Sequence, residues 1–169
     1  GIILSTWMDR PLSLAGRAWV REGNKLCHKL VTFDRDLVML PNLAYHMNRE
    51  VNEKGVFNKQ QDMMPVISAS DEDLTVNGLI AEELGVREED ITGTDIFVVN
   101  RTAPSIWGAH KEFVSMGRLD DMQCIYGILE GFLKGSPKNT INVLCCFDNE
   151  EVGSSTKQGA HSLFFYESL

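Results

Sequence analysis

The stretch INVLCCFDNEEVGS, residues 141–154, joins a nearly continuous apolar run to three acidic side chains and a glycine. An apolar run of this length is typical of a strand that helices bury on both faces in a parallel or mixed sheet. Ligand sites form beyond the carboxyl ends of such strands. The stretch therefore predicts an α/β fold, with a candidate site at Asp148, Glu150 and Glu151.

The two adjacent glutamates can take different roles. Successive residues that leave a strand point in opposite directions, so one of Glu150 and Glu151 can face a metal while the other faces the substrate or its attacking water. Spacing alone leaves an alternative open, because acids that precede a helix also serve as caps and as partners of the helix dipole. Residues 152–154 predict a tight turn into a helix that begins near Ser155.

A further carboxylate candidate lies upstream, in the motif GRLDD at residues 117–121. After Asp120, apolar residues recur at spacings of three and four, which predicts a helix that ends near Gly135. Asp120 can either cap this helix or share a divalent metal with the acids at residues 148–151. No pair of histidines at metal-ligand spacing accompanies these acids, so a complete metal site needs ligands from elsewhere.

The first hundred residues predict a separate, β-rich module. Three short segments alternate or stay apolar, namely residues 14–22, 25–33 and 36–40, and Gly23-Asn24 supplies a turn between the first two. These features predict a hairpin and a third strand. Residues 93–110 read as a strand, a proline break and a second short strand, so the boundary between the two parts is expected near residues 97–103.

Two helices are expected inside this module. Leu43, Met47 and Val51 lie four residues apart, which predicts a short amphipathic helix that carries His46. A second helix is predicted from a cap at Ser70 to a stop at Gly85.

Composition and charge exclude several classes of function. The chain has 169 residues, 43% of them hydrophobic, and a net charge of −8, so we expect a globular protein without a nucleic-acid surface. No apolar run is long enough to span a bilayer, and four cysteines without paired spacing favour reduced thiols and a cytoplasmic location. The chain begins in GIIL without an initiator methionine and stops inside an apolar, uncapped run, so we expect a fragment of a longer protein.

Four motifs follow one another along the chain: TWMDRPLSLAGRAWV at residues 6–20, LPNLAYHMNREVN at 40–52, GRLDDMQC at 117–124 and FDNEEVGSSTKQGA at 147–160. In this order they resemble the aspartyl aminopeptidase family of zinc metallo-aminopeptidases. The resemblance implies part of an α/β sandwich catalytic domain with an inserted β-rich dimerisation domain. Residues 1–6 would form an edge of the catalytic domain, 7–100 the dimerisation domain, and 101–169 a partial catalytic domain.

The same resemblance implies roles for single residues. Asp120 would bridge two zinc ions, Glu151 would ligate one of them, and Glu150 would act as general base and acid. His46 would enter the neighbouring subunit's active site and stabilise the developing oxyanion, although an ordinary helix histidine is the alternative. The family's remaining ligands have no counterpart in the sequence. A non-proline cis peptide is expected between Asp120 and Asp121.

The implied function is removal of N-terminal residues, mainly Asp or Glu, from peptide substrates. The implied assembly is a dimer within a larger homo-oligomer such as a dodecamer. Because two ligands alone hold zinc weakly, we expect the 169-residue chain to be inactive by itself. Two alternatives remain: a non-catalytic oligomerisation module, and a related di-zinc hydrolase with a different specificity.

Overall fold

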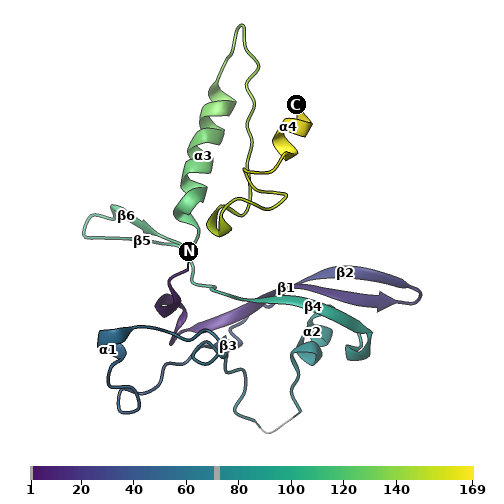
Figure 1. Ribbon diagram of the computed structural model, residues 1–169, viewed down its shortest axis with the longest axis vertical. Helices are drawn as coiled ribbons and strands as arrows, with labels where there is room; N and C mark the ends of the chain where they lie inside the picture. Colours follow the sequence, from purple (N-terminus) through teal and green to yellow (C-terminus); the bar gives the residue numbers. More distant parts are fainter. Residues whose placement is uncertain (1, 71–72) are drawn as a thin grey trace. The chain divides into compact units, whose positions relative to one another are not determined.

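The computed structural model describes residues 2–70 and 73–169, and the chain divides into two compact units (Figure 1). Residues 3–102 form a sheet-containing unit, called here the sheet unit. Residues 103–169, together with Ile2, form the second, called here the carboxyl-terminal unit. The presence of both sheet and helix confirms the predicted α/β class.

The sheet unit is organised around one long strand, β1 (Pro11–Glu22). β1 pairs in antiparallel fashion with β2 (Lys25–Thr32) and with β4 (Ile91–Val99), and its first two residues pair with β3 (Val38–Met39) (Figure 1). The β1–β2 turn contains Gly23 at a φ of 62°, a left-handed conformation that glycine adopts without steric cost. The predicted hairpin is therefore confirmed.

The hydrophobic core lies on one face of this sheet. Alternate side chains of β1 are buried, as the period of two in a strand requires, and Leu12 and Val20 are 0% and 1% exposed. Ile80 and Ala81 of α2 (Val76–Leu84) belong to the same buried cluster. Ser13 is buried on the opposite side of β1 and donates its hydroxyl to the Phe33 carbonyl oxygen at 2.8 Å, which satisfies both polar groups.

Helix α2 begins later than the sequence predicted. Thr75 is its N-cap and accepts a hydrogen bond from the Gly78 amide at 2.8 Å, so the expected cap at Ser70 is wrong. Part of the predicted first turn, residues 71–72, lies outside the described residues. The predicted stop is confirmed, because Gly85 ends the helix with a φ of 64°. A short 3-10 helix, η2 (Glu88–Asp90), then leads into β4.

The amphipathic helix expected around His46 does not form. Residues 45–47 make a single turn, and the only α-helix in this stretch is the four-residue α1 (Val51–Lys54). Leu43 and Met47, whose spacing suggested the helix, are 57% and 73% exposed. Because a short helix gains its stability from packing an apolar face, a segment that buries so little of that face stops at one turn.

The carboxyl-terminal unit combines a small hairpin with one long helix. β5 (Ser105–Trp107) pairs with β6 (Phe113–Ser115), and α3 spans Leu119–Lys134 as predicted, followed by η3 (Glu150–Val152) and α4 (Phe164–Ser168). The ring centroids of Trp107 and Phe113 lie 4.7 Å apart across the hairpin.

Two predictions for this unit are wrong. Residues 141–147 lie outside any strand, and residues 155–163 form turns rather than the expected helix, which begins only at Phe164. Ile141 is 92% exposed, and Gly159 is the one buried residue among those described in the unit. A buried strand requires partner strands and covering helices, and residues 103–169 do not supply them. No helix in the described part of the chain is both long and apolar enough to cross a membrane.

Candidate functional site

The two candidate glutamates lie in a compact loop, residues 148–161, called here the acidic loop. Glu150 and Glu151 belong to η3, a single 3-10 turn closed by a hydrogen bond of 2.8 Å from the Gly153 amide to the Glu150 carbonyl. Left-handed residues flank the turn on both sides: Asn149 has a φ of 62° and Gly153 a φ of 95°. The expected tight turn after the acids is therefore present, and both glutamate side chains are exposed.

Hydrogen bonds across the acidic loop hold its two halves together. The Asp148 amide donates to the Gln158 carbonyl at 3.0 Å, and the Asn149 side-chain amide donates to the Thr156 hydroxyl at 2.8 Å. The loop is also closely packed, because a Cβ at Gly159 would lie 2.1 Å from the Ser154 carbonyl oxygen. The loop thus has one defined path, set by contacts that sequence reasoning did not find.

Asp120 lies at a break in the helical backbone at the start of α3. Asp120 and Asp121 both have non-helical dihedral angles, with φ and ψ of −90° and 107° at Asp120. The peptide bond between them is cis, which confirms the prediction from the family resemblance. The N-cap of α3 is Arg118, and no side-chain cap bond is found among the described residues there. The alternative in which Asp120 serves only as a helix cap is thus not supported.

The described residues do not complete a metal site. Across residues 2–70 and 73–169, no group of three or more His, Cys, Asp or Glu side chains could hold a metal ion. Asp120 and Glu151 offer carboxylate oxygens, whereas protein zinc sites normally use three or four ligands, often with histidine nitrogen or cysteine sulfur among them. Asp120 and Glu151 could therefore supply some of the ligands of a zinc site, but not all of them.

His46, the remaining candidate, belongs to the other unit. It lies in the exposed turn at residues 45–47, where its ring is in an edge-on contact with Tyr45 at a centroid distance of 6.4 Å. Exposure on a loop is compatible with presentation to a second subunit and equally with an ordinary surface histidine. The role assigned to His46 stays a prediction.

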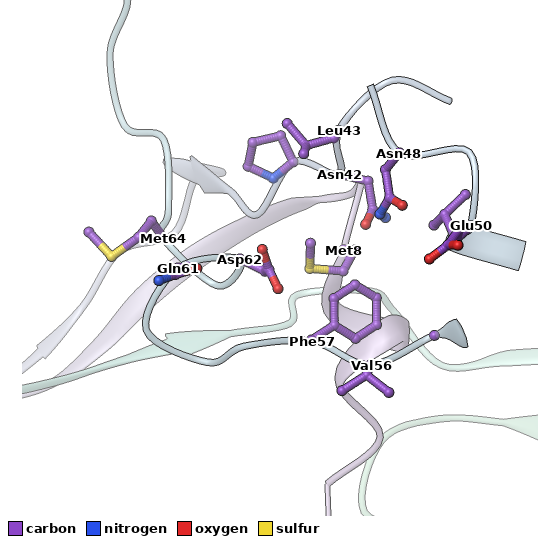
Figure 2. Close-up of a pocket in the computed structure, with 13 residues that line it drawn as sticks. Met8, Asn42, Leu43, Asn48, Glu50, Val56, Phe57, Gln61, Asp62 and Met64 are labelled. Carbon is purple, nitrogen blue, oxygen red and sulfur yellow. The ribbon is translucent and has the colours of Figure 1, made fainter. Parts of the chain in front are cut away.

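A cavity of about 560 Å³ lies beside the His46 turn and was not anticipated from the sequence. Figure 2 shows Met8 and Phe57 at its centre, with Glu50 and Asp62 on opposite sides. Its volume is within the range of small-molecule sites, but its lining combines apolar side chains with carboxylates. Carboxylates would repel an acidic substrate side chain, so this cavity is not suited to select one.

Asp9 links the start of β1 to the segment that carries the His46 turn. Its two carboxylate oxygens accept hydrogen bonds from the backbone and side-chain amides of Asn42, each at 2.8 Å. These bonds hold the pKa of Asp9 below its ordinary value, and the bond from the Asn42 backbone amide has the larger effect.

Comparison with known proteins gives consistent results over the whole chain. The family model described as "Aminopeptidase I zinc metalloprotease (M18)" matches residues 1–169. A probable M18 family aminopeptidase 2 from Clostridium novyi is 44% identical over 96% of this chain, and an aspartyl aminopeptidase from Caenorhabditis elegans is 34% identical over 97%. The chain spans 39% and 41% of those two proteins.

A solved structure resembles the chain as well. The structure of Chaetomium thermophilum mApe1 matches with a TM-score of 0.80 at 29% identity, covering 99% of this chain and 42% of that one. The chain therefore spans about two fifths of the proteins it matches.

Proposed function

This chain belongs to the M18 family of zinc metallo-aminopeptidases, and we propose that it forms part of an enzyme that removes N-terminal residues from peptides. The acidic loop is the observation that carries the proposal. It presents two exposed, adjacent glutamates on one defined turn, and Asp120 lies in the same unit.

The proposal gives Glu150 the proton-transfer role. Its carboxylate would take a proton from the attacking water and later return that proton to the leaving amine, so no net proton stays on the enzyme. Asp120 and Glu151 would contribute ligands to two zinc ions, together with ligands from outside the 169 residues. When bound, zinc would polarise the peptide carbonyl and make a water easier to deprotonate.

The preferred substrates in this proposal are peptides that begin with Asp or Glu. Support comes from the name of the C. elegans relative, an aspartyl aminopeptidase that is 34% identical over 97% of this chain. The four cysteines, free in the structure, support a cytoplasmic location.

A substitution that keeps the shape of the Glu150 side chain but removes its charge tests the role of Glu150 in the complete protein. We expect Glu150→Gln to lower kcat on an N-terminal aspartyl peptide by about 10²–10⁴-fold, since general acid–base catalysis is worth that much. Zinc content, measured by metal analysis, should stay unchanged. Glu167→Gln, at an exposed position in α4, removes one negative charge from the same unit and should leave kcat unchanged. Retained turnover in Glu150→Gln would exclude this role.

The 169-residue chain by itself should be inactive, because Asp120 and Glu151 are its only proposed zinc ligands. Two carboxylates leave the metal short of the three or four protein ligands that zinc sites use. Measurable hydrolysis of an aspartyl or glutamyl peptide by this chain would contradict the proposal. Tests with a panel of peptides of other N-terminal residues, on the complete protein, would separate it from a related di-zinc hydrolase with a different specificity.

Self-association is the second part of the proposal, and the sheet unit carries it. Residues directly opposite in the β1 register share a face, so Trp19, Leu26, Leu30 and Phe97 lie on the sheet face opposite the core. Leu30 and Phe97 are 78% and 66% exposed. Large apolar side chains gathered on one exposed face mark an interaction surface, and we assign a second copy of the chain to it. A dodecamer built from such dimers remains the expected final assembly.

The assembly proposal has its own test. Leu30→Lys in the complete protein should shift its sedimentation velocity profile toward smaller species, whereas Leu30→Met, which keeps the side chain apolar at the same exposed position, should not. The alternative of a purely non-catalytic assembly module predicts an intact oligomer without zinc, so zinc stoichiometry of the complete protein separates the two.

A further inference from the structure

We propose that the hydrogen bond between Asn149 and Thr156 is a positioning device that sets the directions of Glu150 and Glu151. This inference rests on the proposed aminopeptidase function and adds two residues to its machinery. Neither residue is proposed to touch substrate or metal.

Asn149 directly precedes the two glutamates and is held by three hydrogen bonds. Its backbone amide donates to a carboxylate oxygen of Asp148 at 2.7 Å, and its carbonyl accepts from the Ser154 amide at 2.9 Å. Its half-buried side-chain amide donates to the Thr156 hydroxyl at 2.8 Å. The backbone and the side chain of Asn149 are therefore both held.

The conformation of Asn149 explains why such restraint matters. Its φ of 62° is left-handed, a region that non-glycine residues enter at a cost and that asparagine tolerates better than most. The chain direction into Glu150 follows from this conformation. A rotation at Asn149 would redirect the Cα–Cβ bonds of both glutamates together.

The acceptor is held as firmly as the donor. The Thr156 carbonyl accepts from the Gly159 amide at 3.1 Å, and Gly159 packs against Ser154 so closely that any Cβ would overlap its carbonyl oxygen. The Ser154 carbonyl also accepts from the His161 amide at 3.1 Å. Thr156 thus belongs to a packed part of the acidic loop and can serve as a fixed reference point for Asn149.

A positioning role differs measurably from a merely structural one. If the bond only stabilised the loop, its loss would lower the melting temperature and leave the active site unchanged once the protein is folded. If it orients the glutamates, its loss weakens zinc binding through Glu151 and slows proton transfer through Glu150. Substrate binding by other residues would be unaffected, so kcat would fall while KM stayed nearly constant.

The test uses three variants of the complete, zinc-loaded protein. Thr156→Val removes the hydroxyl at nearly the same volume, Thr156→Ser keeps it, and Asn149→Gly keeps the left-handed backbone but removes the donor. We expect Thr156→Val and Asn149→Gly each to lower both zinc affinity, measured by competition with a chelator, and kcat at saturating zinc, by about 10–100-fold. Thr156→Ser should restore both values to within about twofold of the unsubstituted protein.

The double variant measures the coupling directly. If one hydrogen bond carries both effects, adding Asn149→Gly to Thr156→Val should cause little further loss. Full additivity would overturn the inference, as would a Thr156→Val protein with unchanged kcat and zinc affinity, or a Thr156→Ser protein as impaired as Thr156→Val. If Thr156→Val does not fold, Asn149→Gly tests the same bond from the donor side. An unsubstituted protein without zinc or peptidase activity would instead refute the proposed function itself.

Discussion

Replacing Gly16 with alanine tests the close approach of β1 and β4 on which the sheet unit depends. Gly16 lies in the middle of β1, opposite Ile96 of β4. A Cβ at this position would lie 1.9 Å from the Asp95 carbonyl oxygen and 2.9 Å from its carbonyl carbon. Both are backbone atoms of the paired strand, so no side-chain rotation relieves the overlap.

The size of the effect follows from this geometry. Ordinary van der Waals contact would require β4 to move away by about 1.5 Å, which disturbs ladder hydrogen bonds on both sides of Gly16. Overpacking of this kind costs about 1–3 kcal/mol, and the reduced freedom of the unfolded chain returns about 0.4–1 kcal/mol. We therefore expect a net loss of about 1–2 kcal/mol, a large share of the stability of a small domain.

Gly93→Ala is the matched control, because Gly93 lies in β4 of the same sheet. Its added Cβ would meet only the Trp19 Cδ1 atom, at 3.8 Å, which is ordinary contact. This variant should be neutral or stabilised by up to about 1 kcal/mol. The free energy of unfolding of a small protein falls by about 1–3 kcal/mol per M of urea. The urea midpoints of the two variants, followed by far-UV circular dichroism, should therefore differ by about 1 M. Equal midpoints would refute the steric argument.

Two further predictions concern the same unit. The two Asn42 hydrogen bonds lower the pKa of Asp9 in the folded protein, so the ionised carboxylate of Asp9 adds to the free energy of unfolding. This stabilisation is fully present above the ordinary pKa of an aspartate, and it is lost as the pH falls through the lowered pKa. NMR titration should show the Asn42 amide shifting together with a depressed Asp9 pKa, and an ordinary Asp9 pKa would contradict this. Thr75→Ala should destabilise α2 by about 1 kcal/mol through loss of the bond to the Gly78 amide, and Thr75→Ser should recover most of it in urea unfolding. An alanine variant as stable as the unsubstituted chain would show that the cap is unimportant.

The predictions that succeeded were mostly those of local structure. The turn at Gly23, the stop at Gly85 and the helix after Asp120 each depend on a few neighbouring residues, and all three are observed. The cis peptide at Asp120-Asp121 was expected from family resemblance and not from residue chemistry. Local sequence patterns therefore predict the structure of a segment correctly where that segment depends on few distant contacts.

Two of the failed predictions required distant partners, whereas the misplaced cap at Ser70 was a local error. The spacing around His46 resembles an amphipathic helix, but Leu43 and Met47 stay exposed and Val51 is only half-buried. Residues 141–147 have the composition of a buried strand, yet a strand is stable only when neighbouring strands pair with it. Composition predicts what a segment can become, whereas packing decides whether it does.

The sequence by itself determined the family, the α/β class and the identity of the acids in the acidic loop, because these depend on residue types in a fixed order. Only the tertiary structure decided how those acids are held. The Asn149–Thr156 hydrogen bond and the contact of Gly159 with Ser154 join residues five or seven positions apart through a left-handed turn. Such contacts follow from the path of the backbone in space, and spacing along the chain does not specify that path.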